Sequence, residues 1–421
     1  MAQRGFKQAT VRALGSLLAL CAGWVGFALS ACSPSTPESM EVVPGIEVLA
    51  ADSAHLLRDM RVGLITNHTG RGRAGTSSAE LLLRAGVDVA VLLSPEHGLT
   101  GGAGPGEAVS DDTDESTSLP VHSLYGERRK PDAALLAELD ALVFDVQDIG
   151  ARYYTYVSTM TEAMRAAAAH GLRFVVADRP NPIGGQHVQG NVLDKRFASF
   201  VGPLPVAMRH GMTAGELALM FNAEADLGAD LRVVPAVGWR RSEWFDETSI
   251  PWTPTSPNMP DLESASHYPG TCLFEGTGVS VGRGTSRPFQ QVGAPWVDAD
   301  ALKRAVDARA ILGVRLEAVI FTPQGADDGK FEGLRVPGVR LEVTDRSSYD
   351  PTRLALALLI EMHAMAGPAW EWRPESFDRL AGTDRLRRDI EAGVPVATIL
   401  DRWQGARVRF ERTRAQYLLY P

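Results

Sequence analysis

The sequence predicts an α/β fold: a doubly wound parallel sheet, followed by a second, smaller α+β domain at the C-terminus. Short apolar runs of strand length alternate with helical patterns over the first half of the chain, and repeated strand–helix units favour a parallel sheet. The runs are nearly all apolar, which is typical of strands that helices cover on both faces. After residue 250 the composition changes to a long stretch rich in Gly, Pro and Arg, so the regular alternation of strands and helices ends there.

The elements of the first domain come in regular order, and residues that begin or end helices mark several of them. Gly86 and Gly171 stand where two helical patterns stop, and glycine is the usual residue after a helix end. Thr213 and Glu216 have the spacing of a capping box, which marks a helix start. We expect strands at 61–66, 87–94, 141–146, 172–177 and 231–237, and helices at 78–85, 132–140, 155–169 and 213–225.

The same patterns divide the chain into five parts. A signal peptide (1–31) and a tether (32–44) precede the α/β domain (45–250), and a loop-rich segment (251–297) leads to the α+β domain (298–421). Long ordered loops are usually functional, so we expect the active site in the cleft between the two domains. In the last part the patterns predict helices at 298–308, 353–365, 385–392 and 395–403, and strands at 314–321 and 339–343.

Composition and motifs exclude several classes of protein. The 421 residues are 45% hydrophobic and 22% charged, which is ordinary for a globular protein. The net charge of -9 argues against nucleic acid as a partner, and three cysteines exclude a disulfide scaffold. The glycine-rich run 101–106 fits neither a dinucleotide fingerprint nor a Walker loop. There is no zinc-binding His or Cys motif and no nucleophile elbow, so we expect neither a metal nor a cofactor.

The N-terminus indicates the compartment. Basic residues precede an apolar stretch at 13–29, which ends in Leu29-Ser30-Ala31-Cys32. This pattern resembles a bacterial lipoprotein signal, in which the chain is cut before the cysteine and Cys32 carries the lipid. Two or more acyl chains anchor a protein stably. We therefore expect a lipid-anchored protein of the cell envelope that faces the periplasm, with Ser33 favouring the outer membrane. A plain secretory signal or a short anchor helix is the alternative.

Polar and charged residues come directly after four of the predicted strands, at the point where each strand ends. In open α/β sheets, ligands bind beyond the carboxyl ends of the strands, so these residues together predict a binding site. A turn or helix-cap role is the alternative for any one of them alone. The residues are Asn67, His68, Glu96, His97, Asp148, Arg152, Asp178, Arg179 and Asn181.

Several longer motifs follow one another along the chain, at 94–98, 145–150, 152–156, 178–182, 210–213, 256–260, 268–271, 377–383 and 417–420. Taken in order, they are similar to the exo-β-N-acetylmuramidase family of the NamZ type, formerly a domain of unknown function, from about Gly45 to Tyr420. The resemblance implies a Rossmann-like domain, a smaller C-terminal domain, and a glycoside hydrolase that releases N-acetylmuramic acid from the non-reducing ends of peptidoglycan fragments. The sequence departs from the family pattern at Gln189, where we expect an acidic residue.

The reaction that the resemblance implies usually needs two carboxyl groups, one to protonate the leaving oxygen and one as base or nucleophile. Glu96 is our first choice for the acid that protonates the leaving oxygen, because it lies after a strand in a loop that we expect to be partly buried. Glu275, in the loop-rich segment, is the first candidate for the second carboxylate, and Asp178 and Asp148 are its rivals. A substrate-assisted route, in which the 2-acetamido group of the sugar is the nucleophile, stays open.

The substrate carries a lactyl carboxylate, and the fork of an arginine grips a carboxylate in two places. Arg152, Arg179 and Arg283 are the candidates, with ion pairing to Asp148 or Asp178 as the alternative. Tyr154 and its neighbours are candidates for stacking on the sugar, with core packing as the alternative. For hydrogen bonds to the substrate the resemblance adds His97, Asn181, His210 and Asn258.

Two other function classes stay open. A non-catalytic lipoprotein that binds cell-wall fragments would keep the arginines and tyrosines and tolerate the loss of Glu96. A sugar-phosphate or nucleotide enzyme would need a phosphate-binding loop, which the sequence lacks. We therefore expect peptidoglycan-derived sugars as the ligands, and the sequence does not indicate the oligomeric state.

Overall fold

The computed structural model describes residues 41–126 and 128–421, and a seven-stranded sheet organises its first part. The strands lie in the order β3-β4-β2-β1-β5-β6-β9, and all neighbours are parallel except the edge pair β3–β4. The five strands expected from the sequence are confirmed, and two short edge strands are added to them. Their bounds are β1 (Arg61–Thr66), β2 (Asp88–Ser94), β3 (Asp112–Thr113), β4 (Pro120–Ser123), β5 (Ala141–Asp145), β6 (Arg173–Ala177) and β9 (Asp230–Val234).

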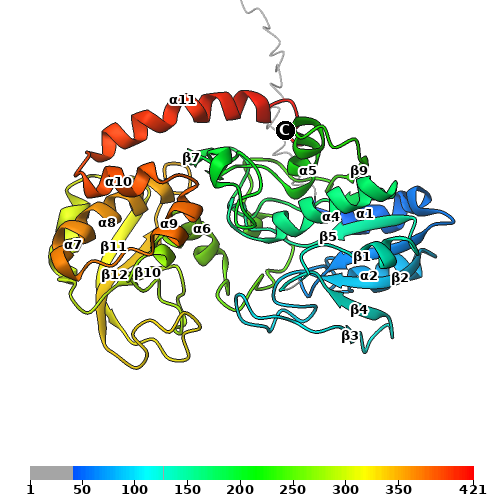
Figure 1. Ribbon diagram of the computed structural model, residues 1–421, viewed down its shortest axis with the longest axis horizontal. Helices are drawn as coiled ribbons and strands as arrows, with labels where there is room; N and C mark the ends of the chain where they lie inside the picture. The colour runs from blue at the N-terminus through cyan, green and yellow to red at the C-terminus, as the bar shows by residue number, and fades with distance from the viewer. Residues whose placement is uncertain (1–40, 127) are drawn as a thin grey trace, which may run out of the picture. The chain divides into compact units, whose positions relative to one another are not determined.

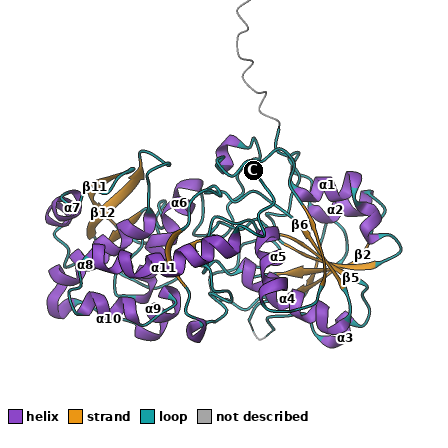
Figure 2. Cartoon of the chain, turned by 90° about the horizontal axis from the view of Figure 1, so that it is seen from above, coloured by secondary structure: helices purple, strands orange, loops and turns teal. Residues whose placement is uncertain are grey.

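Helices cover both faces of this sheet, as Figure 2 shows. Side chains alternate between the faces: in β5, Ala141 and Val143 pack on one side, and Leu142 and Phe144 on the other. This explains why the runs are apolar throughout, since neither face meets water. One face carries α1 (Gly45–Asp52) and α2 (Ser78–Arg84), and the other carries α3 (Ala133–Leu136), α4 (Tyr156–His170) and α5 (Ala214–Glu224).

The helix ends agree with the sequence signals. Both hydrogen bonds of the predicted capping box form between Thr213 and Glu216 at the start of α5. Gly171 ends α4 with a φ of 72°, a backbone conformation that glycine adopts without a steric cost. The helix expected at 132–140 is shorter, because α3 spans only one turn before the chain enters β5.

A smaller antiparallel sheet lies in the C-terminal part of the chain. Its order is β10-β12-β11, with α7 packed on its strands and α8 packed on α7. The strand at 314–321 has the expected bounds, and the second predicted strand begins three residues earlier, at Val336. The elements are β10 (Gln291–Gly293), β11 (Val314–Phe321), β12 (Val336–Val343), α7 (Ala299–Asp307) and α8 (Pro351–Ala366).

Three helices differ from expectation. The segment expected to be rich in loops contains α6 (Leu262–Thr271), which holds Pro269 near its end. A further helix, α9 (Pro374–Ala381), was not expected. The helix expected at 395–403 continues to residue 414 as α11 (Val396–Arg414), after α10 (Arg385–Glu391). Proline and glycine have low helix propensity, and they lie inside α6 and, as Gly405, inside α11. This explains why the sequence pattern missed α6 and ended α11 too early.

The described residues belong to one compact unit, and side chains of both sheets share one hydrophobic core. The helix α11 contacts α8 and the strand β7 (Gln189–Val192), which pairs with β8 (Ala207–Arg209) in a short hairpin (Figure 1). The chain end then returns to the first sheet, where the hydroxyl of Tyr420 donates to Asp178 at 2.6 Å. The last helix and the tail therefore tie the end of the chain to the α/β part.

Candidate active site

A cavity of about 140 Å³ lies beyond the end of β2 and is completed by residues of the C-terminal part. Two carboxyl groups line it: Glu96, from the turn after β2, and Glu275, from the short helix η4 (Cys272–Gly276). The cavity therefore brings together the two residues that the sequence ranks first for catalysis. Its other lining residues are His97, Pro105, Tyr125, Tyr153, Tyr154, Thr155, Val201, Ser256, Asn258, Met259, Tyr268, Cys272, Arg283, Phe289 and Leu380.

Glu96 is 7% exposed and its hydrogen-bond donors are all neutral among the described residues. Its Oε1 accepts from the backbone N–H of Gly106 at 3.1 Å, and its Oε2 accepts from the hydroxyl of Thr155. Tyr125 lies close by, and burial, together with the charge of Glu96, raises the pKa of this phenol above its ordinary value. The phenol therefore stays protonated beside the carboxyl group.

His97 holds a backbone conformation that side chains rarely adopt. Its φ is 72°, and such strain at a non-glycine residue is common at functional sites. The ring Nδ1 lies 2.7 Å from the carbonyl oxygen of Ala103, so Nδ1 donates and Nε2 of the neutral ring is an acceptor. The glycine-rich run 101–106 is thus bonded to both His97 and Glu96.

Glu275 stands in a network of charges. The Arg283 guanidinium donates to its Oε1 through Nε at 2.6 Å and Nη2 at 2.5 Å, and Nη1 lies 3.2 Å from Asp327. Although burial lowers it, these two carboxylates raise the pKa of Arg283 above its ordinary value. Glu275 is therefore paired with a fixed cation, whereas Glu96 has neutral partners.

Aromatic rings form one wall of the cavity. The rings of Tyr154 and Tyr268 meet edge to face with centroids 5.7 Å apart, and Tyr268 packs in the same way on Phe289 at 4.7 Å. The hydroxyl of Tyr154 lies 2.7 Å from that of Thr255, and burial raises the pKa of Tyr154 above its ordinary value. This wall is rigid and uncharged, which suits the apolar face of a sugar.

Two of the three candidate arginines lie outside the cavity. Arg152 donates to four backbone carbonyl groups, and burial lowers the pKa of its guanidinium to about 10. Arg179 binds Asp145 in a buried ion pair, with its Nε 2.5 Å from the carboxylate. Neither expected partner, Asp148 or Asp178, pairs with either of them. The carbonyl groups that Arg152 binds belong to Asn191, Val206, Leu380 and Ala381.

Asp178 is also outside the cavity and is fully buried. It accepts hydrogen bonds from Thr213, from the N–H of Gly215 and from Tyr420, and burial raises its pKa. The strand β6, at whose end it lies, is three strands away from β2 in the sheet. At about 4.8 Å a strand, Asp178 and Glu96 come after strands roughly 14 Å apart, which is too far for two carboxyl groups acting on one bond.

Three further candidates are buried near the strand ends but do not line the cavity. Asp148 accepts from the N–H of Gly150 at 2.7 Å, and burial raises its pKa to about 7. Asn181 donates to the carbonyl of Met212. Burial lowers the pKa of His210 to about 3, so its ring is neutral. Each of the three holds the backbone of a turn beside the site.

Gln189, where the sequence departs from the family pattern, lies in β7 away from the cavity. Its amide donates to the carbonyl of Tyr349 at 3.0 Å and its oxygen accepts from Arg209 at 2.9 Å. The residue therefore joins two parts of the chain, and the cavity keeps both of its carboxyl groups.

Several lining residues were not predicted as site residues. Tyr125 comes after β4, a strand too short and too close to Pro120 to be recognised from its pattern. Thr155 was expected only as a helix start. Cys272 is a further lining residue, and its thiol lies 3.6 Å from Glu275. The cluster of aromatic residues around Tyr268 is the one sequence signal that points to this wall.

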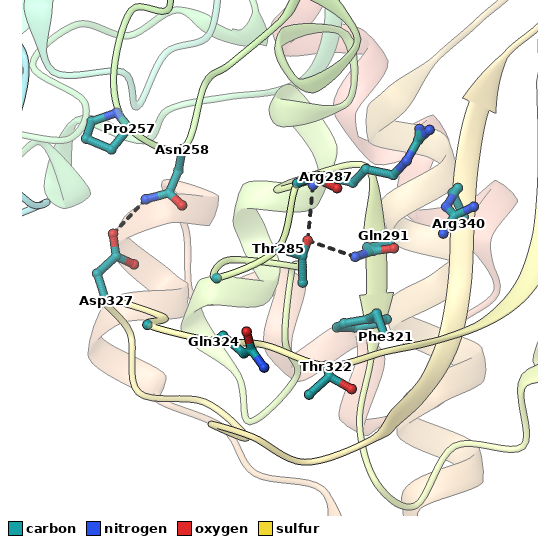
Figure 3. Close-up of a pocket in the computed structure, with 13 residues that line it drawn as sticks. Pro257, Asn258, Thr285, Arg287, Gln291, Phe321, Thr322, Gln324, Asp327 and Arg340 are labelled. Carbon is teal, nitrogen blue, oxygen red and sulfur yellow. Dashed lines mark hydrogen bonds between the residues drawn. The ribbon is translucent and has the colours of Figure 1, made fainter.

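A larger cavity adjoins the first and holds about 700 Å³. Figure 3 shows it between residues 257–258, the loop 284–291 and the residues after β11. We call it the outer cavity, and Asn258 lines both cavities. Its lining residues are Pro257, Asn258, Gly284, Thr285, Ser286, Arg287, Gln291, Phe321, Thr322, Gln324, Gly325, Asp327 and Arg340.

The described residues hold neither a cluster of metal ligands nor a membrane span. Within 41–126 and 128–421, no three His, Cys, Asp or Glu side chains gather closely enough to hold a metal ion. No helix in that part of the chain is long and apolar enough to cross a membrane.

Comparisons with known proteins show the family. The family model for the N-terminal part of exo-β-N-acetylmuramidase NamZ matches residues 62–263, and that for its C-terminal part matches 266–420. A Bacillus subtilis (strain 168) protein named peptidoglycan β-N-acetylmuramidase NamZ is 39% identical over 414 residues, 96% of this chain and 99% of its own. Crystal structures of two DUF1343 family proteins from Bacteroides fragilis NCTC 9343 match with TM-scores of 0.84 and 0.72 and identities of 34% and 32%; each covers 90% of this chain and 99% of the other.

Proposed function

The chain belongs to the exo-β-N-acetylmuramidase NamZ family, and from this premise we propose the roles of its cavity residues. It is a glycosidase that releases N-acetylmuramic acid from the non-reducing ends of peptidoglycan fragments during cell-wall turnover. The observation that carries the proposal is the pair of carboxyl groups in one cavity, of which one is ion-paired and the other is not. Glycoside hydrolysis needs two such groups with different tasks.

Glu96 is the general acid that protonates the leaving oxygen. Among the described residues no cation pairs with it, and the phenol of Tyr125 and the hydroxyl of Thr155 fix its orientation. Glu275 is held in place by Arg283 and stabilises the positive charge that develops on the sugar ring in the transition state. The partners of each carboxyl group thus account for the two tasks.

The remaining lining residues position the sugar. Tyr154 and Tyr268 offer an aromatic wall to the sugar ring, and Nε2 of His97 and the amide of Asn258 are among the groups that hydrogen-bond to it. Of the three arginines considered for the lactyl carboxylate, Arg283 alone lines the cavity.

Replacing Glu96 by Gln tests the assignment. The change is nearly isosteric and removes the acidic proton, so release of N-acetylmuramic acid from a chromogenic glycoside should fall roughly 10²- to 10⁴-fold. Glu107, an exposed glutamate near the same loop, gives a matched control, and Glu107→Gln should keep the wild-type rate. A folded Glu96→Gln protein with near-normal turnover would overturn the role. If the wild-type protein binds these sugars without cleaving them, it is a non-catalytic cell-wall-binding lipoprotein.

We also propose that the protein is lipid-anchored in the cell envelope and faces the periplasm, at the outer membrane. The support is the Leu29-Ser30-Ala31-Cys32 run after an apolar stretch, which lies outside the described residues. Replacing Cys32 by Ala should leave a soluble or uncleaved protein without lipid. Labelled fatty acid that still appears on the Cys32→Ala protein would contradict the anchor.

A further inference from the structure

The outer cavity shares a wall with the catalytic cavity. The amide of Asn258, which lines both, donates to Oδ2 of Asp327 at 2.6 Å (Figure 3). Asp327 in turn accepts from Arg283, the partner of Glu275. A ligand in the outer cavity thus lies against the network that holds the catalytic carboxylate.

The lining of the outer cavity has the chemistry of a sugar site. Hydroxyl and amide groups give both donors and acceptors, and one aromatic ring, that of Phe321, is among them. The lining holds three charged residues, and two of them are balanced, since Arg340 lies 3.3 Å from Glu317 and Asp327 pairs with Arg283. The third, Arg287, is exposed and donates to the side-chain oxygen of Gln290 at 3.2 Å. The volume of about 700 Å³ lies within the usual range for small-molecule sites. The neutral polar groups are Asn258, Thr285, Ser286, Gln291, Thr322 and Gln324.

The reaction itself requires a place for the part of the substrate that leaves. An enzyme that removes the terminal sugar holds that sugar in one cavity, while the rest of the fragment stays joined to the scissile oxygen until the bond breaks. The fragment must therefore extend from the catalytic cavity into adjoining space. Among the cavities found in the described residues, the outer cavity is the one that shares a lining residue with the catalytic cavity.

We propose that the outer cavity binds the leaving saccharide, an N-acetylated hexosamine of the peptidoglycan strand, through its hydroxyl and acetamido groups. The inference rests on the proposed function and adds the position of the second sugar. It implies that the protein distinguishes substrates by the group on the leaving side of the scissile bond, and not only by the terminal sugar.

Two substrates with the same terminal sugar separate this role from catalysis. An aryl β-N-acetylmuraminide has a small leaving group, whereas the disaccharide of N-acetylmuramic acid and N-acetylglucosamine places a sugar in the outer cavity. The double variant Thr322→Ala with Gln324→Ala removes two exposed polar side chains. It should lower kcat/KM for the disaccharide roughly 30-fold, mainly through KM, because two neutral hydrogen bonds are lost, and leave the aryl glycoside unchanged.

Two further variants complete the test. Phe321→Leu keeps an apolar side chain and removes the ring, so it should also slow only the disaccharide. Ile320→Ala, next to it on β11 but 57% exposed and outside the cavity, is the matched control and should change neither rate. Equal losses on both substrates, or no loss on the disaccharide in any variant, would overturn the proposal. If the wild-type protein cleaves neither substrate, the proposed function fails, and the two failures are thereby distinguished.

Discussion

Two buried arginines show that the residue type alone does not predict which groups a side chain will bind. Arg152 and Arg283 were equal candidates for the lactyl carboxylate, yet one binds only backbone carbonyl groups and the other binds two carboxylates. A guanidinium needs hydrogen-bond acceptors, but every residue has a backbone carbonyl group. The sequence therefore does not indicate which carbonyl groups an arginine will bind. The fold alone decides which acceptors each arginine finds.

Arg152→Met should therefore cost stability and not specificity. The guanidinium joins the segments around the β7–β8 hairpin to the end of α9, and each buried carbonyl group left without a donor costs on the order of 1–3 kcal/mol. We expect the free energy of unfolding in urea to fall by roughly 3 kcal/mol or more. Arg196→Met, at a guanidinium that is 78% exposed, should lie within about 0.5 kcal/mol of wild type. Equal effects of the two changes would contradict this role.

Arg283→Met should slow every substrate. Without its cation, Glu275 loses the partner that fixes its position, so kcat should fall for N-acetylmuraminides and N-acetylglucosaminides alike. The measurement is the ratio of kcat/KM for the two sugars, in the variant and in wild type. A variant that slows only the muraminide, and so flattens the preference, would show instead that Arg283 binds the lactyl carboxylate.

Asp148 makes the free energy of unfolding depend on pH, and the burial of its carboxyl group sets the sign of that dependence. Burial raises its pKa from 3.8 to about 7, so the folded state holds a proton that the unfolded state releases between these values. Stability is thus lost as pH rises from about 4 to about 7, by at most roughly 4 kcal/mol. His210, with a pKa of about 3, acts in the opposite direction over much of this range.

Asp148→Asn removes one of these two opposed contributions. Relative to wild type, the variant should gain stability progressively from pH 4 to pH 7 and show no further change above that. Urea unfolding at pH 4.5, 6 and 7.5 provides the comparison. A difference between the two proteins that is constant with pH would show that Asp148 is ionised in the folded state throughout.

At the scale of elements, the glycine-rich run 101–106 controls the geometry of the acid. A Cβ atom on Gly101, whose φ is +77°, would stand 2.1 Å from the ring of His68. Gly101→Ala should therefore displace the loop that bonds Glu96 and His97, and lower kcat/KM by roughly 10-fold or more. Gly228→Ala introduces similar backbone strain in open space, so it should cost about 1–2 kcal/mol of stability and leave kcat/KM unchanged. Equal kinetics in the two variants would contradict the role of the loop.

The elements also show what the sequence could and could not predict. The central strands were predicted within a few residues, because a short apolar run between turn residues is typical of a buried strand. The helix α6 was missed because Pro269 and Gly270 are usually helix breakers, although here they stand at its last turn. The short edge strands carry too few apolar residues to form a pattern, and Tyr125 was missed together with β4.

At the scale of the whole molecule, strand order decides which strand ends share a site. The sequence places polar residues after four strands, and it was reasonable to expect one cluster. The order β2-β1-β5-β6 separates Glu96 from Asp178, and the second carboxylate comes instead from Glu275, beyond α6. The order of strands in a sheet depends on contacts between residues far apart in the sequence, so local patterns do not predict it. A resemblance to a family does predict it, because members of a family share one fold.

The tail of the chain gives the last prediction, because it joins the molecule's end to its first sheet. Tyr420→Phe removes the hydroxyl that donates to Asp178 and accepts from the N–H of Ala236. A hydrogen bond to a charged group contributes about 1.5–3 kcal/mol, so the free energy of unfolding should fall by this amount. Truncation after residue 414 should cost more, since it also uncovers Trp239, on which the ring of Tyr420 packs.

The same variant decides between the two interpretations of Asp178. If Asp178 is a structural group outside the cavity, folded Tyr420→Phe protein should have the kcat and the pH–rate profile of wild type. As a catalytic carboxylate, it would lose one of its hydrogen-bond donors, and its pKa would rise because a donor to the charged form is gone. The rising limb of the pH–rate profile would then move to higher pH by a measurable fraction of a unit. An unchanged profile in a destabilised protein is the expected result, and it would leave Glu96 and Glu275 as the pair on which the reaction depends.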